Sequence, residues 1–219
     1  MKWFIEDFEA LSLNKELLER EIEKIKGKIL EAYYIANEVE GEVILPLLNI
    51  SFNKTRHVEV QVLSNSILIR LVRKLKASKK EEIREIIYIG EVEVPGKIPH
   101  KHEHSTVEVK VKVNWFQDFL KKLKVSEEEK RAYIKKANES SERIFKALTH
   151  TRELEAQTII IIDGKVEELF ETSILRTVEI LAESPERAYI CFTEERIRTG
   201  TTLQHVFRIG KLNIVLASK

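Results

Sequence analysis

The sequence predicts an α+β fold with an N-terminal amphipathic helix, an antiparallel β-meander of about five strands, a helical connector and a small C-terminal α/β unit. In the first part, apolar residues recur at alternating spacings of four and three, as in a helix. In the second part, segments of alternating apolar and polar residues are separated by turn residues, as in strands with one solvent-exposed face. The parts span residues 1–41, 42–113, 114–156 and 157–219.

The first helix carries a stripe of apolar and small residues after Asn14, a favourable N-cap. Gly41 is a typical residue to follow the end of a helix. The stripe has the a/d spacing of a coiled coil about three heptads long. It either packs on the chain's own domain or joins two chains. Its members are Leu18, Ile22, Ile25, Ile29, Ala32 and Ala36, of which the first four are the predicted oligomerisation residues.

The meander is predicted from alternating segments separated by turn residues. Pro46 interrupts the first segment, which therefore belongs at an edge or carries a bulge. In the second segment, valines alternate with polar residues from Val58 to Val62, so the two faces differ in polarity. The segments cover about 43–50, 57–63, 67–75, 83–94 and 107–113.

Two helices form the predicted connector. The first is short, over 115–123. The second begins at the N-cap Ser126 and runs to about residue 150. Glu129 stands three residues after Ser126, where its side chain completes a capping box.

The C-terminal unit opens with an unbroken β-branched run at 158–162, which predicts a buried strand. Asp163-Gly164 is a strong turn signal. Residues 165–170 then form a hairpin partner or begin a helix that we expect over 174–181. Two further strands, 187–197 and 202–216, complete the unit.

Composition limits the function and indicates the habitat. There are 37 Lys and Arg against 36 Asp and Glu, so binding to nucleic acid would need a local patch. Abundant Lys and Glu with one Met and one Cys are typical of hyperthermophiles. We expect a protein of a thermophilic archaeon, of its virus, or of a thermophilic bacterium. Cys191 is the single cysteine of the sequence, so internal disulfides and paired-cysteine zinc sites are excluded. We interpret it as a core residue.

The sequence shows no targeting or membrane signal. Glu6 and Asp7 stand where a signal peptide needs apolar residues. No window approaches the roughly 18 apolar residues that a membrane span requires. We therefore expect a cytoplasmic protein, or a host-intracellular one if viral, with no membrane partner.

Three of the six histidines, His100, His102 and His104, form the segment H-K-H-E-H. In an extended segment they project to one side, and an H-x-H pair can present two nitrogens to zinc or a similar ion. At a rise of about 3.3 Å per residue, His100 and His104 lie about 13 Å apart, so a shared ion requires a bend. We expect no cofactor unless this cluster binds a divalent metal, for which His57 is a candidate further ligand. The alternative is a solvated loop.

A second candidate is Arg143 with His150, separated by six residues near the end of a predicted helix. The spacing resembles the R-x4–6-H signature of HEPN ribonucleases over eight residues. This resemblance implies that both side chains act on an RNA phosphate. Alternatively, His150 complements the helix dipole.

Basic residues concentrate around one predicted strand and its turn. Such an edge, with Lys121, Lys122 and Lys124 near aromatic residues, suits a phosphate backbone. Lysine on an edge strand also prevents aggregation, and neighbouring glutamates neutralise part of the charge. The predicted nucleic-acid-binding residues are Arg70, Arg73, Lys74, Lys76, Lys79 and Lys80.

Motifs of the common enzyme classes are missing from the sequence: there is no Walker A, G-x-G-x-x-G or G-x-S-x-G motif. The leading hypothesis is a non-enzymatic binding or scaffold protein that acts with a protein partner or self-associates. The alternatives are a nucleic-acid-binding protein using the basic strand and turn, and a metal-dependent hydrolase or RNase using the histidines.

Overall fold

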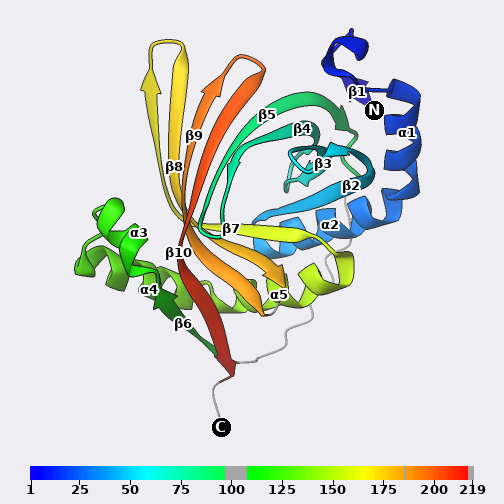
Figure 1. Cartoon of the computed structure of the whole chain (residues 1–219). Coiled ribbons are helices and arrows are strands. Elements are labelled where there is room, and N and C mark those ends of the chain that lie inside the picture. Colours follow the sequence, from blue (N-terminus) through cyan, green and yellow to red (C-terminus); the bar gives the residue numbers. More distant parts are fainter. Residues whose placement is uncertain (97–107, 185, 217–219) are drawn as a thin grey trace.

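A closed antiparallel barrel organises the chain in a computed structural model that describes residues 1–96, 108–184 and 186–216 (Figure 1). In the described residues, eight strands follow one another in the order β5-β4-β3-β2-β7-β8-β9-β10, and β10 pairs with β5 to complete the circle. Closure leaves no free edge among these strands. Their bounds are β2 (Glu42–Asn53), β3 (Arg56–Val62), β4 (Ile67–Ala77), β5 (Glu81–Val92), β7 (Gln157–Leu169), β8 (Thr172–Ser184), β9 (Arg187–Arg198) and β10 (Thr201–Leu216).

Two shorter strands extend this sheet. β1 (Lys2–Trp3) pairs with the end of β5, and β6 (Val109–Trp115) pairs with the end of β10 beyond the barrel. Helices lie along the outside of the barrel, and Figure 1 shows α2 and α5 passing beneath it in that view. The helices are η1 (Glu9–Leu11), α1 (Lys15–Lys24), α2 (Lys26–Val39), α3 (Gln117–Lys122), α4 (Glu127–Glu139) and α5 (Ser141–Leu154).

The molecule consists of two halves with the same order of elements, two helices followed by four strands. The first half is α1-α2-β2-β3-β4-β5 and the second is α4-α5-β7-β8-β9-β10. α2 and α5 each have 14 residues and end at a glutamate in the left-handed region, Glu40 with φ 50° and Glu155 with φ 53°. At the third position of each helix, a basic side chain reaches the other half: Lys28 lies 3.8 Å from Glu155, and Arg143 donates to the Glu40 carbonyl at 3.0 Å.

The two seams between the halves give the relation between them. The first strands of the halves pair with each other around Val43 and Thr158, and the last strands pair around Arg84 and Gln204. Each antiparallel pairing is symmetric about its centre. One pseudo-twofold axis through both seams therefore relates the halves, although no internal repeat is evident in the sequence.

Each barrel strand presents one face to the helices and one to the barrel interior. On β3, Val58, Val60 and Val62 are fully buried in the main core, while Glu59 and Gln61 alternate with them and are also buried. The predicted alternation is present, but the polar face points into the barrel rather than to bulk water.

The predicted fold class is wrong. Strands from the predicted meander and from the predicted C-terminal unit belong to one ten-stranded sheet within the described residues. Residues 174–181 lie in β8 and not in a helix. Both faces of that strand are covered, so its apolar residues do not alternate, and such a run cannot be distinguished from a buried helix by periodicity.

The predicted turn, hairpin and capping box can be compared with the structure one by one. Asp163-Gly164 is not a turn but lies within β7, beside a bulge between Ile161 and Asp163. Residues 165–170 neither return as a hairpin partner of 158–162 nor begin a helix, because β7 runs on without a turn to Leu169 and pairs with β8. The capping box of Ser126 and Glu129 is confirmed. In the described part of the chain, no helix is both long and apolar enough to cross a membrane.

Candidate binding site inside the barrel

A buried ion pair lies in the middle of the barrel. Glu59 on β3 faces Arg70 on β4 directly, and the carboxylate and guanidinium are 2.7 Å apart at 4% and 2% residue exposure. His57 lies 3.0 Å from the second carboxylate oxygen, and Arg84 lies 3.9 Å from the first. Burial alone would raise the pKa of Glu59, but the Arg70 and Arg84 guanidinium groups, together with the hydrogen bond to His57, hold it far below its usual range.

A second buried carboxyl, Glu179 on β8, has different partners. The Thr177 and Thr193 hydroxyls donate to it at 2.7 and 3.0 Å, and these are neutral donors. Burial, together with the nearby carboxyls of Glu42 and Glu195, raises the pKa of Glu179 to about 7. This carboxyl has no cationic partner among the described residues.

Polar side chains bridge the β5–β10 seam between the halves, and others lie close to the β2–β7 seam. At the β5–β10 seam, Arg84 donates to Gln204 at 3.0 Å, and Gln204 donates to Glu195 at 2.6 Å. Near the β2–β7 seam, the Gln61 amide nitrogen donates to Glu42 at 2.5 Å. The Gln61 carbonyl oxygen is buried and has no hydrogen-bond partner. Burial raises the pKa of Glu42.

A cavity of about 650 Å³ opens at one end of this network. Each of the eight barrel strands contributes at least one lining residue, so the cavity is the mouth of the barrel; the end of α5 forms part of its rim. The volume is in the range of small-molecule sites. The charged and titratable lining residues are His57, Glu59, Lys74, Glu82, Arg84, Arg152, Glu155, Glu183, Arg187 and Arg208.

Each carboxylate that lines the mouth already has a cationic partner. Besides the Glu59 pair described above, Glu82 lies 3.4 Å from Lys74, Glu183 lies 2.9 Å from Arg208, and Glu155 lies 3.8 Å from Lys28, which is outside the cavity.

The lining arginines are not all matched in this way. Arg152 and Arg187 form no ion pair within the described ranges, and the buried Nε of Arg208 has no acceptor. The mouth therefore has unmatched positive charge.

An apolar cluster lies within the barrel beside the polar network. Cys191 belongs to it and is fully buried, and burial raises the pKa of its thiol, so the prediction of a core cysteine is confirmed. The cluster contains Ile44, Ile159, Leu181, Cys191 and Val206, with Tyr189 packed against it. Arg208 stacks over Tyr189 at 5.1 Å, which joins the apolar cluster to the charged mouth.

The predicted metal site cannot be placed. His100, His102 and His104 lie outside the described residues. His57 lies in the barrel mouth, where it contacts Glu59. In the described ranges, no group of three or more His, Cys, Asp or Glu side chains is arranged to hold a metal ion.

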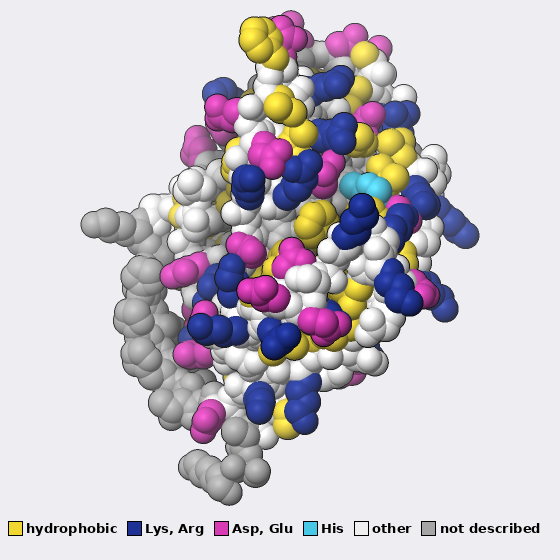
Figure 2. Space-filling view, turned by 90° about the vertical axis from the view of Figure 1, so that its left-hand side faces the viewer, with side chains coloured by type: hydrophobic (Ala, Val, Ile, Leu, Met, Phe, Trp, Pro, Cys, Tyr) yellow, Lys and Arg dark blue, Asp and Glu magenta, His cyan; other side chains and the backbone are white. Residues whose placement is uncertain are grey.

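The predicted nucleic-acid-binding residues separate in the structure. Arg70 is buried inside the barrel and unavailable to a surface ligand. Arg73, Lys74 and Lys76 pair with glutamates on β5, at 3.1, 3.4 and 2.9 Å. Lys79 is exposed, and Lys80 lies 4.6 Å from the centre of the Phe116 ring. Figure 2 shows acidic and basic side chains interleaved over most of one face of the molecule.

The predicted oligomerisation stripe packs within its own chain. Leu18, Ile22 and Ile29 are 0 to 4% exposed in the main core, and Ile25 packs against that core. Ile25 also interrupts the predicted continuous helix, because it separates α1 from α2. These side chains are thus occupied by intramolecular packing.

Arg143 and His150 do not converge on a common site. Arg143 donates to the Val39 carbonyl at 2.7 Å, which gives this carbonyl at the end of α2 a hydrogen-bond partner. His150 lies 3.8 Å from Glu153 and 3.9 Å from Glu38. The arginine has a structural role at the interface of the two halves.

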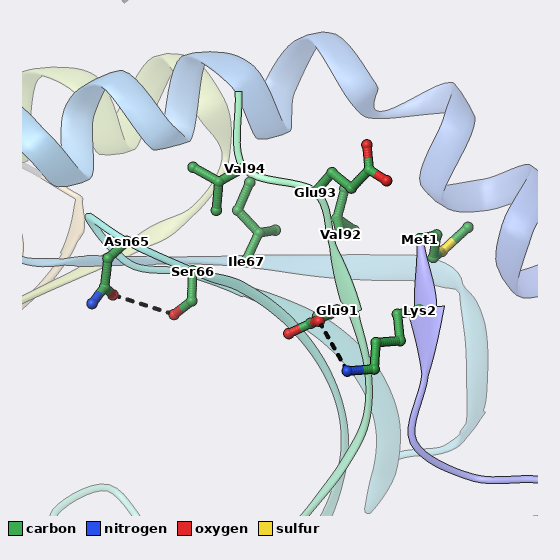
Figure 3. A pocket seen from close by; sticks show the side chains of 9 residues that line it. All are labelled: Met1, Lys2, Asn65, Ser66, Ile67, Glu91, Val92, Glu93 and Val94. Atoms are coloured by element: carbon green, nitrogen blue, oxygen red, sulfur yellow. Dashed lines mark hydrogen bonds and ion pairs between the residues drawn. The ribbon is translucent and has the colours of Figure 1, made fainter. Parts of the chain in front are cut away.

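A second hollow lies where β1 meets the end of β5, with a volume of about 310 Å³ (Figure 3). Its charged side chains are Lys2, Glu91 and Glu93, and Lys2 pairs with Glu91 at 3.8 Å. Both partners are substantially exposed, so this ion pair is weak. The barrel mouth, with its buried polar groups, is the stronger candidate.

Sequence patterns alone do not predict most residues of the barrel site. The alternation predicts Glu59 and Gln61 on a solvent-exposed face, and the apolar run predicts Glu179 in a helix. A sequence signal for these residues is that the alternating strands carry both acidic and basic residues on their polar face. Comparisons with protein-family models, curated proteins and solved structures found no significant match to this chain.

Proposed function

We propose that this chain is a binding protein that holds a small anionic ligand in the mouth of its barrel. The observation that carries the proposal is the excess of arginine in a cavity whose carboxylates are already paired. Arg152 and Arg187 lack partners in the described ranges, and Arg208 has a buried Nε without an acceptor. Arginine binds phosphate and carboxylate through parallel hydrogen bonds, which suits such groups on a ligand.

The surrounding structure supports binding at a fixed position. The cavity is built on strands of a closed barrel, and Arg208 is held by Glu183 at 2.9 Å. Rigid placement lowers the entropic cost of ordering the site when the ligand binds. Ile44, a member of the apolar cluster, lines the cavity and offers a contact for an uncharged part of the ligand.

Isothermal titration calorimetry with inorganic phosphate, pyrophosphate and citrate tests the proposal. We expect binding that weakens with salt, and an affinity at least about tenfold lower in the variant Arg152→Gln/Arg187→Gln, which corresponds to about 1.4 kcal/mol. Arg131→Gln, at an exposed position on α4, is the matched control and retains the wild-type affinity. Failure of all three anions to bind, or equal binding by the double variant, would disprove the assignment.

A further inference from the structure

The pseudo-twofold axis places Glu59 and Glu179 in equivalent positions, each on the second strand of its half. The residue directly opposite Glu59 on the third strand is Arg70, whereas the residue opposite Glu179 is Cys191. The first carboxylate thus has a guanidinium partner, and the second faces an uncharged thiol. The second half lacks the cation that balances the first.

A neighbouring position shows the same difference. Lys74 stands opposite Arg84 on the last strand of the first half, and Glu195 stands opposite Gln204 at the corresponding place in the second. Near the Arg84–Gln204 seam, the first half thus has two cations, Lys74 and Arg84. The second half has none at the equivalent positions and has the carboxyl of Glu195 instead. In the described part of the barrel's middle, Glu42, Glu59, Glu179 and Glu195 face only two guanidinium groups, those of Arg70 and Arg84.

Gln61 provides an independent observation. Its side chain is more than nine-tenths buried, and its amide nitrogen donates to Glu42, which places the amide against that carboxyl. Its carbonyl oxygen is buried without a donor. A buried acceptor without a donor is costly, and it marks a position where a hydrogen-bond donor is missing.

We propose that the barrel binds a small cation, an ammonium group or a metal ion, between Glu179, Glu42 and the Gln61 carbonyl oxygen. The cation replaces in the second half the positive charge that Arg70 supplies in the first. Each of these groups is an acceptor, so they suit the three N–H donors of an alkylammonium.

The site is distinct from the anion site in the mouth. That site depends on Arg152 and Arg187 at the rim, whereas the cation contacts side chains of β2, β3 and β8. The titratable groups around Glu179 are Glu42 on β2 and Cys191 and Glu195 on β9, and the guanidinium groups of Arg70 and Arg84 act on Glu42. A cation between Glu42 and Glu179 favours the ionised form of both.

Calorimetric titration of the full chain with methylammonium, putrescine, Mg²⁺ and Mn²⁺ tests the proposal. Because Glu179 has a pKa of about 7, we expect affinity to rise about tenfold from pH 6 to pH 8, with a proton released on binding below pH 7. Glu179→Gln, which keeps the shape of the side chain, should weaken binding at least tenfold and remove the Glu179 part of the pH dependence. Glu168→Gln, at an exposed position on β7, is the matched control.

The four probes distinguish the source of the cation. Binding of the amines identifies an ammonium ligand, and binding of the divalent ions alone identifies a metal. Either result supports the site if Glu179→Gln loses it while remaining folded by circular dichroism. The proposal is overturned if no probe binds at pH 8, or if the variant binds as tightly as the wild type.

Discussion

Replacing Arg70 with methionine tests whether the ion pair in the barrel is a determinant of stability. The substitution removes both guanidinium contacts to Glu59 and leaves this carboxylate buried at 4% exposure, with His57 at 3.0 Å and Arg84 at 3.9 Å. Breaking a buried pair by removing one partner costs about 3 to 5 kcal/mol. Because His57 remains, we expect a loss near the lower end, about 3 kcal/mol.

The effect of pH has a definite sign. In the wild type, the pKa of Glu59 is lowered, so its stabilising contribution is present above the unfolded-state pKa of about 4.3 and is lost as the pH falls toward the folded-state value. Without Arg70, burial raises this pKa, and the ionised carboxylate destabilises the fold until it is protonated. The difference in unfolding free energy between Arg70→Met and wild type should therefore be largest at pH 8 and shrink toward pH 5.

Unfolding by guanidinium chloride, followed by the fluorescence of Trp3 and Trp115, measures this difference in unfolding free energy. In the double variant Glu59→Gln/Arg70→Met the loss should be smaller than in Arg70→Met alone, because no unpaired charge remains buried. Arg176→Met is the matched control: Arg176 pairs with Glu167 at 2.9 Å and with Glu194 at 3.0 Å, but its own side chain is 37% exposed, so we expect at most about 1 kcal/mol. A loss for Arg70→Met as small as this control, or one independent of pH, would refute the reasoning.

Two further substitutions examine the packing of the halves. A Cβ at Gly41 would lie 2.5 Å from the Ile159 carbonyl oxygen, so Gly41→Ala should destabilise the β2–β7 seam by about 1 to 3 kcal/mol in thermal unfolding; an unchanged midpoint would contradict the seam geometry. Leu18→Ala should lower stability by about 2 to 5 kcal/mol without changing the mass seen by light scattering, because Leu18 is fully buried in its own chain; a changed mass with unchanged stability would instead support the coiled coil.

Local sequence patterns predicted many elements of this fold but not its closure. Four segments of the predicted meander correspond to β2 to β5, because their turns and alternation are local signals. The seams join residues far apart in the chain: Val43 pairs with Thr158, and Arg84 with Gln204. No local pattern specifies such partners. Without the closure, Glu59 and Gln61 read as solvent-facing residues, and the barrel interior could not be inferred.

The repeat is hard to see in the sequence because the two halves share residues at only a few positions, most clearly where the helices pack. Ile29 and Ile144 occupy the same position in α2 and α5 and are both buried; so do Ala32 and Ala147. Inside the barrel, Glu59 and Glu179 are equivalent and identical, but the residues that face them, Arg70 and Cys191, differ. Packing on the helices requires only similar volume and polarity at a few positions. The interior is free to differ between the halves. Equivalent positions on one symmetric framework can therefore favour ligands of opposite charge.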